Sequence, residues 1–418
     1  MIPFRPRLRC SSLHCASRRL YSISAPPTST SKPLLVLGIE SSADDSSASI
    51  VSSQREILSL VTISQHDQNS LHGGIHPLLA QASHNKNIPI AISRCLNEAK
   101  VDISEIDAIA YTRGPGMRGC LSIGEMAAKG LAAGTNKRLI GVHHMQAHAL
   151  TPLLTEPIPP KFPFWILLVS GGHTQLVLAE SQDKFKILLD TLDSKIGDVF
   201  EKAARLIKLP YSITKSPGAI LESFASLSPL SPYDQNPLKP LPIPLTTNES
   251  ARIKAFSFSG ILSSLQRQIN PDLRSGRDQS KQEIEVRLSE ADQREFSRIF
   301  QNATIGHLVL KLQQALTAKD NSTNMNDLGG FVVSGGVASN LFLRKSLKTM
   351  LTTMSENEVG DGQGVKLYYP PISLCTDNAA MIAWTGLLRL QSGLFSDPYG
   401  LPLRPKWSLE DLYDDVES

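Results

Sequence analysis

L-L-V-L-G-I-E-S-S-A-D-D-S-S-A-S-I-V, residues Leu34–Val51, is the stretch that decides the fold. Its first part, Leu34–Ile39, is a continuous apolar run typical of a buried central strand. An acidic turn follows at Glu40–Ser46, and apolar residues then resume a strand as far as Val51. A further strand is expected at Ile57–Ile63, so the predicted order is strand, acidic turn, strand, strand.

The same plan recurs in the second half of the chain. Phe164–Val169 is an apolar run, S-G-G-H-T at Ser170–Thr174 is a turn, and Gln175–Ala179 predicts the returning strand. A third strand and S-G-G turn occur at Phe331–Gly336, and a helix is expected after them, from about residue 339 to 350. Small residues let the backbone approach an anion closely, and consecutive N–H groups in such turns form an anion-binding nest.

This duplicated plan resembles the superfamily of actin, sugar kinases and heat-shock chaperone ATPases, in which two similar lobes enclose a nucleotide. The two S-G-G turns and the acidic turn resemble its two phosphate loops and its adenosine loop. The resemblance implies an α/β fold with two RNase H-like lobes. We expect residues 34–150 to form the first lobe, completed by about 372–418. Residues 151–371 are expected to form the second, with inserted loops near 211–250 and 266–294.

Gly141–Leu150 reads G-V-H-H-M-Q-A-H-A-L and predicts the end of a strand followed by a helix. His144 and His148 are four residues apart, so on a helix they project from one face and could share one metal ion. Two unrelated histidines would give the same spacing. The sequence disfavours a zinc protease of the H-E-x-x-H kind, because Met145 stands where that site has its catalytic glutamate.

Residues 1–39 contain no aspartate or glutamate, whereas five arginines lie among the first 21 residues. An arginine-rich, serine-rich and acid-free N-terminus is typical of an organelle transit peptide. Arg19–Ser22 also resembles the site at which mitochondrial presequences are cut. We therefore expect residues 1–33 to be a transit peptide and linker, and the mature protein to lie in the mitochondrial matrix. A disordered tail without a targeting role is the alternative.

Removal of the five arginines would change the balance from 42 basic against 39 acidic residues (+3) to 37 against 39 (−2). Net charge therefore gives no evidence for a nucleic-acid partner, which would need a local basic patch. One candidate is R-I-K-A-F-S-F, Arg252–Phe258, which could contact phosphates and stack on bases. Core aromatics beside surface cations explain it equally well. No apolar stretch approaches the about 20 residues that span a bilayer, so no membrane partner is expected.

Eight motifs in chain order resemble those of the TsaD family, the tRNA adenosine threonylcarbamoyltransferases. They are G-I-E-S-S-A-D-D-S (Gly38–Ser46), G-G-I-H-P (Gly73–Pro77), T-R-G-P-G-M-R-G (Thr112–Gly119), H-H-M-Q-A-H (His143–His148), L-L-V-S-G-G-H-T-Q-L (Leu167–Leu176), F-S-F-S-G (Phe256–Gly260), V-S-G-G-V-A-S-N (Val333–Asn340) and C-T-D-N-A-A-M-I-A (Cys375–Ala383). Together with the N-terminal segment they resemble the mitochondrial members.

The resemblance implies a reaction that needs two proteins. A separate synthase makes threonylcarbamoyl-adenylate (threonylcarbamoyl-AMP) from threonine, bicarbonate and ATP. The family member then transfers the threonylcarbamoyl group to the N6 amine of adenosine 37 in tRNAs that read codons beginning with A. Bacterial relatives require partner subunits and mitochondrial relatives act as a homodimer, and the sequence leaves this choice open.

The resemblance also implies which residues form the site. One divalent metal ion per subunit, iron or zinc, would be bound by His144, His148 and Asp377. Asp44 and Asp45 would act as a general base or would organise the phosphate end of the adenylate. The adenylate would be bound by Leu168, Val169, Ser170, Gly171 and Gly172 at its phosphate, by Glu201 and Gly218 at its ribose, and by Asn340 on its adenosine side.

Some positions depart from the family pattern. Ala43 stands where many members have cysteine, which excludes thiol chemistry in the acidic turn, and Ala219 replaces a second glycine after Gly218. Two other classes use similar loops, a small-molecule or sugar kinase and a non-catalytic ATPase module. Neither needs a metal ion bound by two histidines and an aspartate, so the metal content of the purified protein would discriminate between the classes.

Overall fold

A computed structural model of the chain describes residues 32–65, 69, 74–210, 212, 215–227, 238–270, 287–318, 327–357, 365–393 and 396–415. Leu34–Ser418 groups into one unit by its contacts. The predicted transit peptide lies almost wholly outside the described residues, as do parts of both predicted insertions. The transit peptide and the boundaries between the lobes therefore stay predictions.

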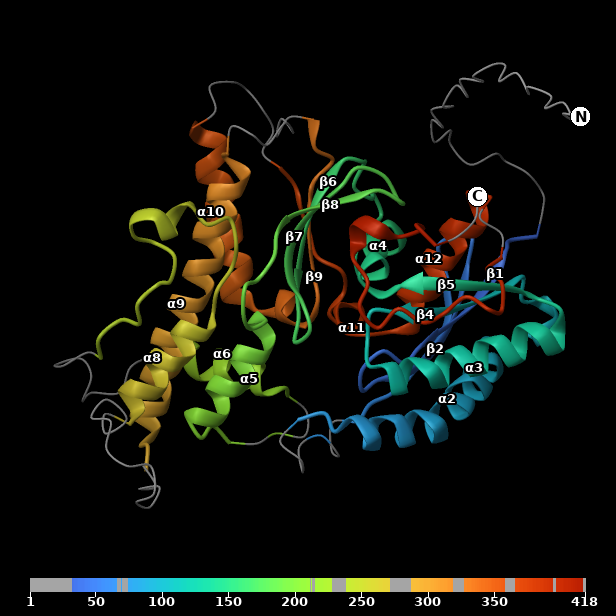
Figure 1. The fold of residues 1–418 in the computed structure, drawn as a ribbon, viewed down its shortest axis with the longest axis horizontal. Coiled ribbons are helices and arrows are strands. Elements are labelled where there is room, and N and C mark those ends of the chain that lie inside the picture. The colour runs from blue at the N-terminus through green and yellow to red at the C-terminus, as the bar shows by residue number, and fades with distance from the viewer. Residues whose placement is uncertain are drawn as a thin grey trace, which may run out of the picture. The chain divides into compact units, whose positions relative to one another are not determined.

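Five strands form the first sheet, in the order β3-β2-β1-β4-β5 (Figure 1). They are β1 (Leu35–Glu40), β2 (Ser46–Ser52), β3 (Ile57–Ile63), β4 (Ala108–Gly114) and β5 (Arg138–His143). The first three pair antiparallel, whereas β4 lies parallel to β1 and β5 parallel to β4. The predicted order of strand, acidic turn, strand, strand is confirmed.

The second sheet repeats this topology. Its strands are β6 (Phe164–Val169), β7 (Thr174–Ala179), β8 (Phe185–Leu189), β9 (Phe331–Ser334) and β10 (Leu367–Tyr368). Their order is β10-β9-β6-β7-β8, with β6, β7 and β8 antiparallel and with β9 and β10 parallel to β6. Two sheets with the same strand order and directions confirm the duplicated α/β fold that the sequence predicts.

Ten helices of the described residues connect and cover these strands. They are α2 (Pro77–Ala99), α3 (Arg118–Thr135), α4 (His144–Thr155), α5 (Ile196–Leu206), α6 (Pro217–Ser226), α8 (Ser259–Ile269), α9 (Glu290–Leu316), α10 (Leu341–Asn357), α11 (Ile372–Cys375) and α12 (Ala379–Gln391). Short 3₁₀ turns occur at Ile103–Glu105, Asn248–Arg252, Gly336–Ser339 and Leu409–Asp411. Helix α6 and the start of α9 fall inside the two predicted insertions, so these segments are partly helical rather than loops throughout.

The sheets and helices alternate in layers. Helices α2 and α3 pack on one face of the first sheet, and α4 and α12 pack on its other face. Helix α4 also contacts β6 and β9, so the second sheet closes over it. Alternate residues of β6 face opposite sides, as a strand requires: Ile166 joins the core around α4 and α12, and Trp165 joins the core formed with α5, α8, α9 and α10.

Helix α12 starts later than the sequence predicts. The sequence predicts a helix at Thr376–Leu390 with Thr376 as its N-cap, but Asn378 holds that position in the structure, and its side chain accepts a hydrogen bond from the amide of Met381 at 3.1 Å. Both residue types are good N-caps, so the local sequence alone does not separate them. The shift matters because it leaves Asp377 outside the helix, on the connection from α11.

The basic and aromatic segment Arg252–Phe258 does not offer bases a stacking surface. Phe256 and Phe258 are fully buried, and the side chain of Lys311 donates to the carbonyl oxygens of Ala251 and Ile253 from below. The nucleic-acid interpretation of these aromatics is therefore wrong, and the core interpretation is confirmed. Among the described residues, no helix combines the length and apolarity that crossing a membrane requires.

Gly38 on β1 is where α12 approaches the first sheet most closely. A Cβ atom at Gly38 would lie 2.4 Å from the carbonyl oxygen of Ala379 and 2.6 Å from the amide nitrogen of Ala383. We predict that Gly38→Ala lowers the free energy of unfolding by about 1–3 kcal/mol or more, because backbone atoms must shift. Urea unfolding of the purified protein would measure this loss.

Gly130→Ala on α3 is the matched control. A Cβ atom there meets nothing within 4 Å, so this change should be neutral or should stabilise the helix by about 0.5–1 kcal/mol. A Gly38→Ala protein as stable as the wild type would contradict the close packing of α12 on β1.

Candidate metal centre and active site

The site is built where β5 ends and α4 begins. β5 runs to His143, and α4 starts at His144. His143 is the N-cap of α4: its Nδ1 atom accepts hydrogen bonds from the amides of Met145, at 3.1 Å, and Gln146, at 3.3 Å. The helix thus begins at a fixed residue, and its periodicity turns His144 and His148 to the same side, as predicted.

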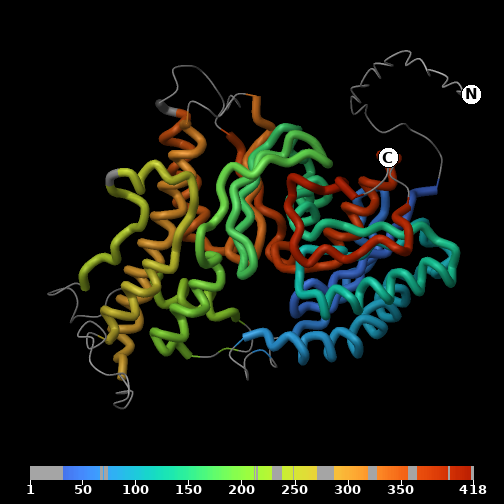
Figure 2. The backbone as a smooth tube through the Cα atoms, in the orientation of Figure 1, coloured from blue at the N-terminus to red at the C-terminus, as the bar shows by residue number. Residues whose placement is uncertain are grey.

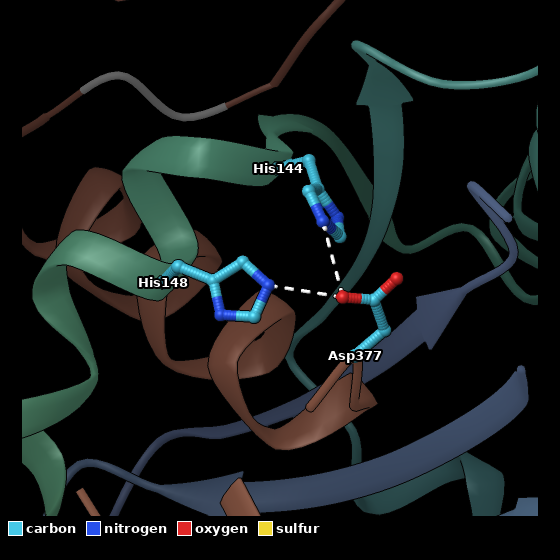
Figure 3. Close-up of side chains that lie close together, drawn as sticks. All are labelled: His144, His148 and Asp377. Carbon is cyan, nitrogen blue, oxygen red and sulfur yellow. Dashed lines mark hydrogen bonds and ion pairs between the residues drawn. The ribbon is translucent and has the colours of Figure 1, made fainter. Parts of the chain in front are cut away.

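His144, His148 and Asp377 meet at one point (Figure 3). The Nε2 atom of His144 lies 3.3 Å from Oδ1 of Asp377, and Nε2 of His148 lies 3.0 Å from the same oxygen. The three candidate ligand atoms all lie within 4.8 Å of one another. Asp377 comes from the connection between α11 and α12, so residues 229 positions apart in the chain form this cluster.

Glu40 contacts His144 on the ring nitrogen that faces away from Asp377, and it was not among the predicted site residues. Its side chain is completely buried, and its Oε2 atom accepts a hydrogen bond from Nδ1 of His144 at 3.1 Å. The hydroxyl of Thr112 donates to the same carboxylate. A carboxylate on the far nitrogen of a histidine fixes the ring so that its other nitrogen faces a metal ion. The only signal in the sequence was an acid at the end of an apolar strand, and its burial in the structure is what distinguishes it from an ordinary turn residue.

The buried carboxylates of Glu40 and Asp377 favour a positive charge in this cluster. Burial would raise the pKa of both carboxyls, but His144 outweighs it and holds the pKa of Glu40 below its usual value and that of Asp377 well below. Burial opposes a charge on His144, yet Asp377 and Glu40 raise its pKa to about 10. One positive charge is therefore favoured in this cluster. A divalent ion would replace the proton on His144, so metal binding should strengthen as the pH rises.

The donor set fits a metal ion. Two imidazoles and one carboxylate suit iron or zinc and leave coordination positions for a substrate oxygen. Nδ1 of His148 is buried and has no hydrogen-bond partner among the described residues, while Nε2 points into the cluster. The described residues therefore contain a candidate three-ligand metal site, and the chemistry of the donors leaves iron and zinc both open.

The acidic turn lies beside this cluster. Asp45 has a buried Oδ1 atom without a partner among the described residues, and burial, then the charges of Asp44 and Asp377, raise its pKa to about 8. Asp44 accepts a hydrogen bond from Asn69 at 2.7 Å. His84 on α2 fixes the turn, because its ring contacts the hydroxyl of Ser46 at 2.8 Å and the carbonyl oxygen of Ala43 at 3.0 Å. A carboxyl that titrates near neutral pH suits general acid–base work.

The first S-G-G turn is also adjacent, since the ring of His173 lies 6.5 Å from that of His144 between centroids. Gly171 and Gly172 are exposed on it, and Leu168 and Val169 are buried in β6. The hydroxyl of Ser170 accepts from the amides of Gly172, at 3.2 Å, and His173, at 3.0 Å. Two amides of the predicted nest are thus bonded within the turn, and their contact with a phosphate stays a prediction.

The three remaining predicted residues lie on the second half of the fold. Glu201 on α5 is 3.5 Å from the guanidinium of Arg205, and Gly218 lies in the first turn of α6, which packs against α5. Asn340 is buried: its amide donates to Gln301 at 3.1 Å and its oxygen accepts from the amide of Leu343 at 2.8 Å. Asn340 therefore caps α10, and its role toward adenosine stays a prediction.

Comparison with known proteins identifies the family. The family model described as "TsaD: tRNA N6-adenosine threonylcarbamoyltransferase" matches residues 56–384. The chain belongs to the TsaD family. A tRNA N6-adenosine threonylcarbamoyltransferase from Rickettsia massiliae is 36% identical over 378 residues, which cover 90% of this chain and 98% of the relative. The enzyme of the same name from Orientia tsutsugamushi is 36% identical over 381 residues, with 90% and 99% covered. This TsaD-family chain is therefore a transferase.

Solved structures similar to this TsaD-family chain are more distant. Component A of the (R)-2-hydroxyglutaryl-CoA dehydratase of Acidaminococcus fermentans is 12% identical, with a TM-score of 0.45 over 84% of this chain and 96% of the other. The ROK hexokinase of Thermus thermophilus is 15% identical, with a TM-score of 0.44 over 86% and 100%.

The metal ligands of this TsaD-family chain can be tested by substitution. We predict that His144→Ala and His148→Ala each abolish stoichiometric metal binding, because each removes one of three protein ligands. Asp377→Asn keeps the shape and should weaken binding less completely. Glu40→Gln should cost only the about 10–100-fold that is typical of an outer-shell partner. Metal content by inductively coupled plasma mass spectrometry would check the series.

His307→Gln is the control, because His307 lies on α9 and binds the backbone amide of Ser257. This variant should keep its metal. If His144→Ala and His148→Ala also keep theirs, the two histidines are not ligands.

Proposed function

We propose that this chain transfers a threonylcarbamoyl group from threonylcarbamoyl-adenylate to the N6 amine of adenosine 37 in tRNAs that read codons beginning with A. The main support for this proposal is that His144, His148 and Asp377 lie together next to the S-G-G turn. A kinase or a non-catalytic ATPase of the same fold would need the turn but not that cluster. The proposed donor comes from a separate synthase, and the proposed ion is iron or zinc.

The reaction forms a bond from N6 of adenosine to the carbamoyl carbon and breaks the bond from that carbon to the adenylate phosphate. One proton leaves the amine, and AMP is released. A divalent ion held by the cluster would supply a Lewis acid for an oxygen of the threonylcarbamoyl group. Because the adenine amine is a poor nucleophile, the alignment of amine and carbonyl contributes more than prior removal of its proton.

The chain's own residues have separate tasks in this proposal. Glu40 holds the ring of His144 so that its Nε2 atom faces the substrate side. Asp45, whose pKa is about 8, accepts the proton from the amine or organises the phosphate end, and Asp44 shares this turn. The exposed glycines of the S-G-G turn give the phosphate room to approach the backbone.

We also propose that the protein works in the mitochondrial matrix, as a homodimer that needs only the synthase. The acid-free, arginine-rich residues 1–21 support the location. The resemblance to mitochondrial members supports the homodimer.

Reconstitution tests the activity directly. The mature protein, a threonylcarbamoyl-adenylate synthase, threonine, bicarbonate, ATP and an A-decoding tRNA should yield threonylcarbamoyl-adenosine in a nuclease digest analysed by mass spectrometry. A tRNA with guanosine at position 37 is the substrate control and should stay unmodified. No product from a metal-loaded, folded protein, with or without added partner subunits, would refute the proposed reaction. Product only with added partner subunits would refute the homodimer that needs only the synthase.

Gly171→Val tests where the phosphate lies. A Cβ atom at Gly171 meets nothing within 4 Å, so the side chain adds bulk to the exposed face of the turn without disturbing the fold. We predict at least a tenfold loss of transfer with unchanged thermal stability. Gly400→Val, another site with no neighbour within 4 Å, should transfer normally. Normal turnover by Gly171→Val would place the phosphate elsewhere.

Import tests the location. The full-length chain, synthesised in vitro and incubated with energised mitochondria, should be protected from protease and shortened by about 20 residues. Replacing the five arginines by glutamine should prevent import, since the positive charge of a presequence drives it. An unprocessed or excluded wild-type chain would contradict the proposed location.

A further inference from the structure

The C-terminal segment Arg404–Asp415 contacts the start of the histidine helix. The family model ends at residue 384, yet this later segment runs alongside β5 and the first turn of α4, as Figure 2 shows in red beside teal. Neither the metal cluster nor the proposed reaction assigns it a task. Two of its contacts reach residues close to His144, namely His143, the N-cap of α4, and Gln146 in the first turn of that helix.

The first contact fixes the tautomer of His143. Its Nε2 atom lies 3.2 Å from the backbone carbonyl oxygen of Trp407. A carbonyl oxygen can only accept, so Nε2 carries the proton and Nδ1 is left as an acceptor. Nδ1 is the atom that accepts from the amides of Met145 and Gln146. The Trp407 carbonyl thus determines that His143 can cap α4.

Trp407 is itself firmly held. Two guanidinium groups contact its indole, with Arg113 at 5.0 Å and Arg404 at 4.9 Å from the ring centroid, and its ring is 4.6 Å from that of His143. The indole N–H donates to the carbonyl oxygen of Asp411 at 2.7 Å. Arg113 is buried and binds the carboxylate of Asp415 through both terminal nitrogens. The position of the carbonyl is therefore not free to drift.

A second contact reaches the other side of His144. The amide of Gln146 donates to the hydroxyl of Tyr413 at 3.0 Å and to the carbonyl oxygen of Gln182 at 2.8 Å. Gln146 is buried. The first turn of α4 is thus held at two points by residues that follow α12 in the chain.

We propose that Arg404–Asp415 is a positioning element of the metal centre, acting on His144 and His148 through His143 and Gln146. The proposal rests on the metal site of the proposed function. A ligand helix needs a fixed starting point, because a displacement of about 1 Å is enough to spoil a functional geometry. His143 and Trp407 are positioning residues, since neither faces the cluster.

Binding of Co²⁺ alone to the metal-stripped, full-length protein tests this inference. The affinity is measured by calorimetry, and the visible d–d absorption reports the ligand geometry. We expect His143→Ala and Trp407→Leu each to weaken Co²⁺ binding about 10–100-fold, as for other outer-shell residues, and to change the spectrum. His143→Asn should recover part of both, because an asparagine oxygen is also a good N-cap.

The double variant His143→Ala with Trp407→Leu separates positioning from general destabilisation. If Trp407 acts through His143, the pair should bind Co²⁺ no more weakly than the worse single variant, because the effects of coupled residues do not add. Trp165→Leu is the matched control, since it removes a buried indole from the other core. It should keep the wild-type affinity and spectrum. If Trp407→Leu does not fold, Tyr413→Phe replaces it as the test, because it deletes only a hydroxyl. This variant should weaken Co²⁺ binding by a smaller factor.

The outcomes separate the two proposals. Wild-type affinity and spectrum in His143→Ala, Trp407→Leu and Tyr413→Phe would overturn the positioning role while leaving the metal centre intact, as would losses that add fully in the double variant. Failure of the wild type to bind Co²⁺, or unchanged binding by His144→Ala, would overturn the metal centre itself and this inference with it.

Discussion

The buried contact between Glu40 and His144 is the interaction on which the site depends. It joins the end of the first strand to the first residue of the histidine helix in a region that excludes water. A buried carboxylate needs a partner of opposite charge or a full set of donors, and His144 together with Thr112 supplies them. The same contact leaves Nε2 of His144 facing Asp377. One pair of side chains therefore neutralises a buried charge at the end of β1 and also orients a ligand atom of the cluster.

The close approach of α12 to β1 also fixes the geometry of the candidate metal cluster. Gly38 lets the backbone of the helix lie directly on the strand, two residues before Glu40. Asp377 then precedes the helix cap at Asn378 and reaches the histidines from the start of α12, which packs beside α4 in the same layer. Fixing both backbones against one sheet restricts the separation of the ligands without any need for a long side chain. This explains why a short aspartate, rather than a glutamate, completes the cluster.

Much of the fold and the pairing of His144 with His148 could be predicted from the sequence, because both leave periodic or spaced patterns, whereas Asp377 was assigned only through the resemblance to the TsaD family. The apolar runs before each turn predicted the strands, and the four-residue spacing predicted the shared face of His144 and His148. Glu40 could not be selected, since a lone acid after a strand looks like any other turn residue until its burial is known. Asn340 was placed by resemblance, and its capping of α10 depends on Gln301, 39 residues away. The burial of Phe256 and Phe258 could not be predicted, because aromatic residues next to basic residues give the same sequence pattern in a core and on a nucleic-acid-binding surface.

The order of the ligands along the chain has a consequence for biosynthesis. His144 and His148 leave the ribosome long before Asp377, and Trp407 and Tyr413 emerge only near the end of translation. The central layer of α4 and α12, which the second sheet closes over, contains residues from both ends of the folded unit. A nascent chain therefore cannot assemble the cluster until Asp377 has been made, close to the end of translation. Any ion that the cluster binds would be acquired only after that point.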